Sequence, residues 1–331
     1  MQFKLASAQV FVPDGLPVEQ ALARTTHLAV AAHQDDIEIM AMDGVLQCYQ
    51  RDDRWLTGVT VTDGAGSSRT GLYADYTDEQ MQTVRRTEQK KAAVVGEYGA
   101  QALLDYPSSG VKDPSNPALV EDLKAIIDVA RPRVIYTHNL ADKHDTHVGV
   151  TLKVIEAIRA LPKADRPKRL LGCEVWRDLD WLLDADKVAF NLSAQENLQA
   201  TLVGLFDSQI SGGKRYDLAT MGRRRAHATY HASHEGDVTT GTNFAMDLTP
   251  LVADPSLHIA WSSSEGVTTA AAIIHPRESN PRLPHRNPNK PTSGNPRRGD
   301  RVPDRTTACR FIKFLPAGAA SRGAGPACRR Q

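Results

Sequence analysis

Short apolar runs alternate with amphipathic segments from residue 26 onward. Four runs rich in Val, Ile, Leu, Ala and Thr predict buried β-strands, at residues 26–32, 55–64, 101–105 and 133–138. Between and after them, apolar residues recur at helical spacing and predict helices, at residues 78–99, 116–130 and 147–161. Gly99 is expected to cap the first of these helices. Strands that alternate with helices indicate crossover connections on a parallel sheet.

Later segments, at residues 170–176, 187–193 and 196–210, can extend that sheet and cover it. We therefore predict a single α/β domain over residues 1–275, with a Rossmann-like, mostly parallel sheet flanked by helices. The composition agrees, because 41% hydrophobic and 24% charged side chains in a chain of 331 residues are ordinary for a soluble globular protein.

The chain carries no signal for a membrane or for export. Its longest apolar runs are far shorter than the roughly 18 residues of a membrane span, and residues 1–15 lack the apolar core of a signal peptide. Its cysteines lie far apart with no Cys-x-x-Cys pair, which argues against both a disulfide framework and a cysteine zinc site: Cys48, Cys173, Cys309 and Cys328. We expect a soluble protein in a reducing compartment, the cytoplasm.

Residues 276–331 differ in charge from the rest of the chain. They hold 13 Lys and Arg against 3 Asp and Glu, a balance of +10, whereas the first 275 residues carry 27 against 36, a balance of −9. Residues 276–305 contain seven of the 19 prolines and almost no large apolar side chains, so burial cannot offset the entropy lost on ordering. We predict a disordered, solvated tail that has no nucleic-acid partner, because no aromatic side chains are interleaved with the basic ones.

Hydrophilic loops follow each of the four predicted strands. The sequence HQDD follows the first strand, TDGAGSSR the second, DYPSSG the third and HNLADKHDTH the fourth. Ligands of open parallel sheets bind outside the carboxyl ends of the strands, so we expect the four loops to converge on one rim.

Two pairs of residues in these loops are three positions apart. His33 and Asp36 can point at one spot from a turn, and His144 and His147 have the same spacing where a helix begins. Two histidines and one carboxylate form the ligand set of a catalytic zinc with a fourth position open for water. Asp35 adjoins a ligand yet can point elsewhere, as a general base would. The loops thus predict a hydrolytic site for zinc or another divalent metal.

Capping is the structural alternative for these polar residues. Asp35 or Asp36 can cap a helix that starts near residue 37. Asp145 or Thr146 can likewise cap the helix at residue 147, and a lone loop histidine can be solvent-exposed. Two polar clusters at the same end of a predicted sheet are harder to attribute to capping, which favours the metal site.

Several motifs occur in an order that is typical of one enzyme family. AHQDD follows an apolar strand, VTDGAG follows the next strand, RRTEQKKAAVVGEYG lies in the following helix, and H-x-x-H opens a later helix. With FDSQISGG further along, these motifs resemble the LmbE/PIG-L family of zinc-dependent N-acetylglucosaminyl deacetylases, over roughly residues 26–235.

The resemblance implies a role for each residue of the predicted site. It implies that zinc is bound by His33, Asp36 and His147. It also implies that Asp35 is the general base and that His144 polarises the carbonyl or protonates the leaving group.

The chain departs from the family pattern at three places. Gln34 stands where the family has proline, and Ala41-Met42-Asp43-Gly44 replaces a glycine pair, so that only Gly44 supports close helix packing. Thr146 stands where the family commonly has aspartate, and the acid is shifted to Asp145. This last change bears on the orientation and pKa of His144.

Other polar residues have weaker functional interpretations. Arg69 and Asp105 lie in the rim loops, where they can hydrogen-bond sugar hydroxyls or form surface ion pairs. A second group of histidines can bind a metal or line a substrate groove: His227, His231 and His234. TDGAG lacks the spacing of a dinucleotide fingerprint or a phosphate loop, which argues against a Rossmann-type cofactor.

The function that these observations favour is hydrolysis of an amide. We expect a zinc-dependent enzyme that removes an acetyl or other acyl group from the amino nitrogen of an N-acetylglucosamine-type sugar. The same site acting on another sugar conjugate, such as a glycopeptide or a thiol sugar, is one alternative. A sugar-binding protein without catalysis is another. The expected partner is a small amino-sugar molecule.

Overall fold

The computed structural model describes residues 1–231, 233–254, 256–264 and 267–273. The predicted tail, residues 276–331, lies outside these described residues, as does the predicted domain boundary at residue 275. No helix within the described ranges combines the length and the apolar character needed to cross a membrane.

An eight-stranded sheet forms the centre of the molecule. Its strands lie in the order β1 (Gln9–Phe11), β4 (Ala100–Tyr106), β3 (Leu56–Thr62), β2 (His27–Ala31), β5 (Val134–His138), β6 (Arg169–Cys173), β8 (Thr242–Asp247) and β7 (Lys187–Asn191). The five strands from β4 to β6 pair in parallel. Antiparallel partners lie at both ends, with β1 on β4, β8 on β6 and β7 on β8. The predicted Rossmann-like, mostly parallel α/β fold is confirmed.

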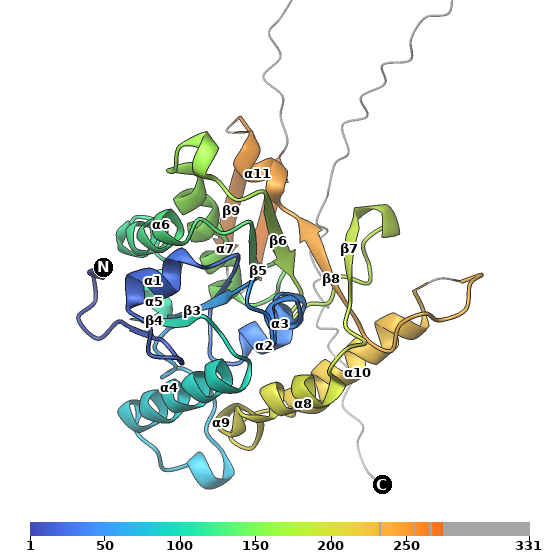
Figure 1. Ribbon diagram of the computed structural model, residues 1–331, viewed down its shortest axis with the longest axis horizontal. Helices are drawn as coiled ribbons and strands as arrows, with labels where there is room; N and C mark the ends of the chain where they lie inside the picture. Colours follow the sequence, from blue (N-terminus) through green and yellow to red (C-terminus); the bar gives the residue numbers. More distant parts are fainter. Residues whose placement is uncertain (232, 255, 265–266, 274–331) are drawn as a thin grey trace, which may run out of the picture.

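Helices cover both faces of this sheet (Figure 1). One face carries α5 (Ser108–Lys112), α6 (Ala118–Ala130), α7 (Asp145–Arg159) and α11 (Thr249–Ala253). The other carries α2 (Asp36–Met40), α3 (Met42–Cys48), α4 (Asp78–Val95) and α8 (Glu196–Gly204). The short α1 (Val18–Ala23) packs beside β4, and α9 (Asp207–Ile210) and α10 (Tyr216–Thr229) continue the layer of α8. A separate hairpin pairs β9 (His258–Ser264) with β10 (Val267–Ile273).

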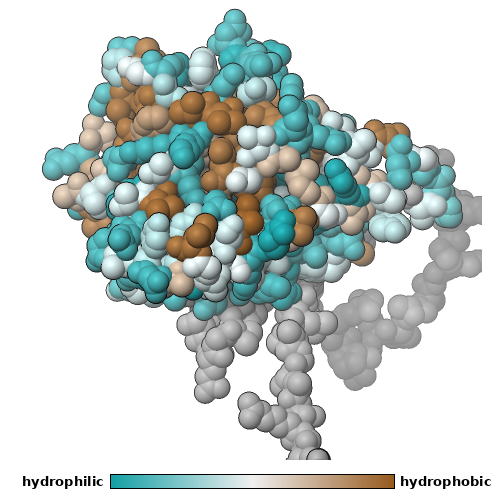
Figure 2. Space-filling model, turned by 90° about the horizontal axis from the view of Figure 1, so that it is seen from below, coloured by the Kyte–Doolittle hydropathy of each residue, from teal (hydrophilic) through white to brown (hydrophobic). Residues whose placement is uncertain are grey.

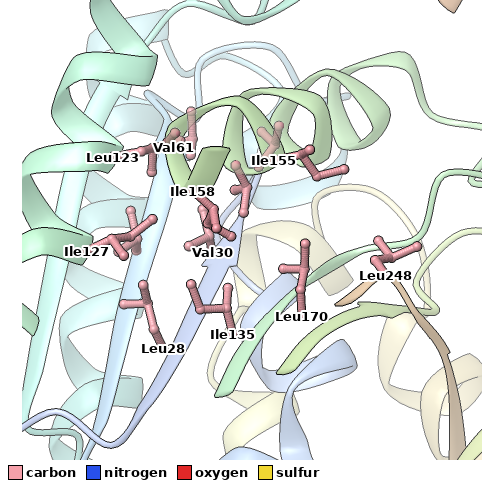
Figure 3. Close-up of a cluster of buried hydrophobic side chains, with 14 of the residues drawn as sticks. Leu28, Val30, Val61, Leu123, Ile127, Ile135, Ile155, Ile158, Leu170 and Leu248 are labelled. Atoms are coloured by element: carbon pink, nitrogen blue, oxygen red, sulfur yellow. The ribbon is translucent and has the colours of Figure 1, made fainter. Parts of the chain in front are cut away.

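Alternation along β2 divides its side chains between the two faces. Leu28 and Val30 pack with α6 and α7 in the larger core, which Figure 3 shows with Leu123, Ile127, Ile155 and Ile158 among its members. Ala29 and Ala31 face α2 and α3, where small side chains allow the helices to approach the sheet closely. Both faces of β2 are therefore buried, as its unbroken apolar sequence predicts.

Gly44 lets α3 pack tightly against β5. A Cβ atom at this position would lie 2.8 Å from Cε2 of Tyr136, a separation that real Cβ atoms do not show. The close packing expected from Gly44 alone is therefore confirmed.

On the outer surface, hydrophilic and hydrophobic side chains are interspersed over the face drawn in Figure 2.

Two details of the predicted helices are wrong. Helix α4 ends at Val95 with Gly96 as its C-cap, while the amide of Gly99 donates to the Leu56 carbonyl at 2.7 Å where β4 begins. Residues 196–210, expected to extend or cover the sheet, form two helices, because Phe206 takes a non-helical conformation between α8 and α9. Helix α7 begins at residue 145 and its N-cap, His144, makes no side-chain cap, so neither Asp145 nor Thr146 caps this helix.

Candidate active site

The carboxyl ends of β2 and β5 form the topological switch point of the sheet. These strands are neighbours, and the parallel strand order reverses between them, with β3 and β4 on one side and β6 on the other. A cavity of about 390 Å³ opens there, lined by His33 after β2, Gly64 after β3, Ser108 after β4 and His144 after β5. The four predicted rim loops therefore converge, at the place where this class of fold binds its ligands.

Three side-chain atoms from the two central loops meet at one point. Nδ1 of His33 lies 3.2 Å from Oδ2 of Asp36 and 3.2 Å from Nε2 of His147. The distance between Oδ2 of Asp36 and Nε2 of His147 is 3.4 Å. Asp36 and His147 are buried, whereas the His33 side chain is 21% exposed toward the cavity. Two imidazole nitrogens and a carboxylate oxygen thus form an almost equilateral triangle.

This triangle has the dimensions of one face of a metal tetrahedron. Ligand atoms about 2.0–2.2 Å from a tetrahedral zinc are about 3.3–3.6 Å from one another. The chemistry of the donors fits as well, because two neutral imidazoles and one carboxylate are a ligand set for a catalytic divalent metal. The structure thus brings together the three ligands predicted from the sequence, His33, Asp36 and His147.

His147 is oriented by a carboxylate that the sequence analysis missed. Its Nδ1 lies 3.3 Å from Oδ2 of Asp142, which fixes the tautomer and leaves Nε2 free to face Asp36. Burial alone would lower the pKa of His147, but the Asp36 and Asp142 carboxylates outweigh it and raise that pKa. The spacing of five residues between Asp142 and His147 in the same loop is the sequence signal that could have identified this pair.

His138, the last residue of β5, is the second residue that the sequence analysis missed. The described residues contain two further groups with potential ligand atoms close together, His33 with His144 and His147, and Asp36 with His138 and His147. Nε2 of His138 accepts the amide proton of Ala32 at 2.9 Å, so its lone pair is already engaged. His138 is therefore better suited to hold the turn after β2 than to bind a metal.

Asp35 and Asp36 are adjacent but lie in opposite electrostatic surroundings. Burial, followed by the charge of Asp36, raises the pKa of Asp35 well above its usual value. For Asp36 burial acts in the same direction, but the imidazoles of His147, His138 and His33 prevail and lower its pKa. Asp36 is thus the carboxylate that stays ionised, while Asp35 is a carboxyl group with raised proton affinity.

The side chain of Asp35 lines the cavity beside the triangle. Asp35 has φ 104°, in the left-handed region, and precedes α2 without a side-chain cap bond. The capping alternative for Asp35 is therefore wrong. The Asp36 carboxylate instead accepts the amide proton of His33 at 2.8 Å, which closes the turn.

His144 lies beside His33 and His147 at the cavity wall. Its ring stacks on His147 with centroids 4.5 Å apart and meets the ring of Trp176 at 5.7 Å. Burial, followed by the neighbouring imidazoles, lowers the pKa of His144 to about 4, so the ring is neutral near pH 7. Its buried Nδ1 has no hydrogen-bond partner among the described residues.

The two predicted sugar-binding residues are engaged elsewhere. Arg69 pairs with Asp78 and donates to the carbonyls of Tyr76 and Ala65. Asp105 accepts both donors of a bidentate ion pair from Arg86, at 3.2 and 2.9 Å. Neither residue is part of the cavity lining, so contact with a sugar stays a prediction for both.

The histidines near the end of α10 do not form a metal cluster in the described part of the chain. The ring of His227 is buried against Phe244, with centroids 4.3 Å apart, and its Nδ1 lies 3.2 Å from Oε1 of Glu174. His231 lies against the same phenylalanine, and His234 is exposed. The alternative of a second metal site has no support in this geometry.

Fold and site together define a Rossmann-like α/β protein with a two-histidine, one-carboxylate cluster at its switch point. Residues 28–158 match the family model described as "PIG-L: GlcNAc-PI de-N-acetylase". This match contains both loops of the cluster and confirms the resemblance to the LmbE/PIG-L family. No curated protein matches the chain.

Solved structures share the fold at low sequence identity. The conserved protein TT1542 from Thermus thermophilus has a TM-score of 0.53 and 19% identity, covering 72% of this chain and 100% of that one. The 4-carboxy-2-hydroxymuconate hydratase GalB from Pseudomonas putida has a TM-score of 0.53 and 15% identity, with 68% and 96% covered. The N,N'-diacetylchitobiose deacetylase from Pyrococcus horikoshii has a TM-score of 0.51 and 14% identity, with 70% and 86% covered.

Proposed function

We propose that this protein is a divalent-metal-dependent hydrolase that removes the acetyl group from the nitrogen of an N-acetylated amino sugar. The observation that carries the proposal is the triangle of His33, Asp36 and His147 with the free carboxyl of Asp35 beside it in one cavity. The family description, which names a de-N-acetylase, supports the reaction class.

We assign zinc as the metal, held by Nδ1 of His33, Oδ2 of Asp36 and Nε2 of His147. A divalent ion in such a site polarises an amide carbonyl and lowers the pKa of water toward about 7. Asp142 supports the ligand set by fixing the tautomer of His147.

Asp35 is the proposed general base. Its raised pKa gives its carboxylate a higher proton affinity than that of an ordinary aspartate. The same carboxyl group, once protonated, can return the proton to the departing amine. Asp36 cannot serve in this way, because its charge is held by the surrounding imidazoles.

His144 is the proposed partner of the amide oxygen. A neutral imidazole donates one hydrogen bond, and burial keeps His144 neutral at physiological pH. We propose that this ring stabilises the negative charge that develops on the oxygen as the carbonyl is attacked. Its stacking on His147 keeps the ring next to the ligand cluster.

The mouth of the cavity offers an aromatic surface for a sugar ring. Trp176 and Tyr216 both line the cavity and pack edge to face, with centroids 6.2 Å apart. Such faces pack against the C–H groups of pyranoses, while a volume of about 390 Å³ suits a monosaccharide with its acyl group. These contacts support a sugar amide as the substrate.

The test is metal content combined with acetate release. Purified protein is analysed by elemental mass spectrometry, and acetate is measured during incubation with several N-acetylglucosamine glycosides. We expect one equivalent of zinc, acetate in proportion to free amine, loss of activity with a chelator and recovery with added zinc. Protein that binds the metal but releases no acetate from any N-acetylated amino sugar would contradict the proposal and favour a binding protein.

A further inference from the structure

Three consecutive arginines of α10 lie in three different surroundings. Arg223 is half-buried, Arg224 is buried and Arg225 is exposed. The helix packs on α8 and β8, in the layer that also contains α2 (Figure 1). Arg225 is an ordinary solvated residue, because its side chain has no partner among the described residues. The other two arginines face inward, where this residue type is seldom found without partners.

Arg224 binds the C-terminal end of α2. Its Nη2 donates to the carbonyls of Glu38 and Ile39 at 2.8 and 3.1 Å, and its Nη1 donates to Oε1 of Gln199 in α8 at 3.1 Å. Nδ2 of Asn243 in β8 donates to the same Ile39 carbonyl at 3.0 Å. The last carbonyls of a helix have no partners within the helix, and a cation is favourable beside them. Arg224 and Asn243 therefore fix the end of this short helix.

Arg224 forms no ion pair with a carboxylate in the part of the chain that the structure describes. Burial lowers the pKa of its guanidinium to about 10, although the charge of Glu174 acts in the opposite direction, so the group is still charged near pH 7. A buried charge is costly, and hydrogen bonds to carbonyl oxygens offset that cost here. An apolar side chain would fill the same volume without the desolvation, so packing alone does not explain an arginine at this position.

The helix that Arg224 holds begins at the two aspartates of the site. Asp36 is the first residue of α2, and the amide of Ile39 donates to the carbonyl of Asp35 at 3.1 Å. Ile39 lies three residues after Asp36, which is about 4.5 Å along a helix axis. A shift at the C-terminal end of so short a helix would therefore move both aspartates.

Arg223 holds a different part of the cavity wall. Its Nη1 donates to the carbonyl of Val175, and the amide of the next residue, Trp176, donates to Oδ2 of Asp142 at 3.2 Å. The peptide unit between Val175 and Trp176 is therefore held from both sides. Trp176 lines the cavity and packs against Tyr216, the first residue of α10. One helix thus supports the aromatic surface of the cavity as well as the helix of the aspartates.

We propose that Arg224 and Arg223 are positioning residues of the hydrolytic site, with separate targets. Arg224 sets the position of α2, and with it the ligand Asp36 and the base Asp35. Arg223 sets the position of Trp176, where the sugar ring binds. Neither arginine lines the cavity, so each acts through the residues that it holds. This inference rests on the proposed function, because it assigns further residues to the same site.

Zinc affinity tests Arg224 without any need for turnover. Arg224→Met keeps a long side chain but removes the donors, and we expect the Kd of zinc to rise about tenfold or more, as when contacts that support metal ligands are lost. Competition with a chelator measures this Kd. With saturating zinc, kcat should fall and KM should change little, because the aspartates move and the sugar surface does not.

Arg224→Lys is a milder variant that serves even if the methionine variant folds poorly. Lysine keeps the charge but lacks the planar fork that reaches two carbonyls and a side-chain amide at once. The Kd of zinc should therefore lie between the values for the wild type and for Arg224→Met.

Arg223→Met should show the reverse pattern. We expect a higher KM for methyl N-acetylglucosaminide, whereas the Kd of zinc should stay within about twofold, because Asp142 still holds the amide of Trp176. Calorimetry of the same glycoside with chelator-treated protein should show weaker binding, and this readout needs neither metal nor turnover. The matched control is Arg225→Met in the same helix, which should change none of these quantities.

A purely structural role would give a different result. Arg159→Met removes donors to the carbonyls of Leu251 and Leu257, both at 2.7 Å, on the other face of the sheet, and should lower Tm without changing the Kd of zinc. The same behaviour in both Arg224 variants, measured well below their Tm, would overturn the positioning role of Arg224. An unchanged KM and an unchanged glycoside affinity in Arg223→Met would overturn the role of Arg223.

These outcomes are distinguishable from a failure of the proposed function. If no N-acetylated glycoside is hydrolysed, the deacetylase assignment fails, but the Kd of zinc still decides the role of Arg224 and calorimetry decides that of Arg223. Weaker zinc binding in Arg224→Met alone would then sustain the first role. A wild-type protein that binds no zinc would remove that role together with the metal site.

Discussion

Asp35 and Asp36 show how one peptide bond can separate two chemical roles. Asp36 faces three imidazoles and keeps its charge, whereas burial raises the proton affinity of Asp35. Asp35 takes a left-handed conformation, at φ 104°, in the turn that places both residues at the cavity. Aspartate tolerates this conformation better than most residues, which fits its position in the turn.

Asp35→Asn is the most direct test of the general base. The amide has nearly the same shape but cannot accept a proton, so we expect kcat to fall by about 10² to 10⁴ with bound metal and KM nearly unchanged. Steady-state kinetics with elemental analysis measures both quantities. As the control, Asp36→Asn should lose the metal first. Near wild-type turnover in a metal-loaded Asp35→Asn protein would refute the assigned role.

The two histidines of the second loop should respond differently to substitution. His147→Ala removes a buried nitrogen of the triangle and should release most of the bound metal. His144→Ala should retain the metal and lower kcat by about 10²-fold or more, because its hydrogen bond acts on developing charge. Metal analysis of both variants is the measurement. Equal loss of metal would show that His144 is a ligand, as in the alternative group with His33 and His147.

At the scale of single residues, the sequence predicts those members of the site that lie within a few positions of one another. His33 and Asp36 share one turn, so their geometry follows from neighbouring positions. His138 acts on Ala32 across 106 positions, and Gln209 reaches the carbonyl of Gln34 across 175. Such contacts depend on strand order and helix packing, which no local pattern specifies. Arg69 shows the opposite case. It is predicted to contact a sugar, but its side chain donates to the carbonyls of Tyr76 and Ala65 in its own loop.

At the scale of elements, the turn between β2 and α2 is held by neighbours on several sides. Nε2 of Gln34 donates to the carbonyl of Thr62 in β3 at 3.0 Å, and Nε2 of Gln209 in α9 donates to the carbonyl of Gln34 at 3.1 Å. The hydroxyl of Thr62 donates to the carbonyl of Ala32 at 2.8 Å. Hydrogen bonding thus holds the turn in place without a proline at residue 34.

Gln34→Ala should therefore weaken metal binding although Gln34 is not a ligand. Loss of supporting contacts around metal ligands typically costs about 10–100-fold in metal affinity, and we expect a change in that range. Competition with a chelator at equilibrium measures it. Gln101→Ala is the matched control, since Gln101 is equally buried and donates to Thr60 in the neighbouring strand β3 and to Ala102 in its own strand β4. Equal metal affinity in the two variants would contradict a positioning role for Gln34.

The long, strongly patterned elements were the ones that the sequence could predict. β2, β3 and β5 are largely buried on both sides and therefore read as runs rich in apolar and Thr residues, and α6 has a clear apolar face. The edge strand β1 has three partly buried residues, and the four-residue α9 is defined by its contacts, not by a pattern. Short elements bury too little surface to impose a periodicity on the sequence.

At the scale of the whole molecule, the basic C-terminal segment is expected to be dispensable. Residues 280–331 contain none of the assigned ligands and little of the apolar periodicity that builds a core, and the last described strand ends at Ile273. Deleting them should change Tm and kcat/KM little, as thermal denaturation and acetate release would show. A large fall in either quantity would mean that the segment takes part in the fold or in catalysis.

The triangle of His33, Asp36 and His147 joins loops from two central strands, so a metal bound there should stabilise the whole domain. A ligand that binds only the native state adds about 2.7 kcal/mol to the free energy of unfolding at 100 times its Kd. For a domain of this size, that corresponds to a rise in Tm of roughly 5–10 °C. Thermal denaturation of chelator-treated protein, with and without added zinc, measures the shift. Asp36→Asn should show almost no shift, because its carboxylate is missing from the triangle. A wild-type Tm that is the same with and without zinc would mean that the triangle of His33, Asp36 and His147 does not bind the metal in the folded protein.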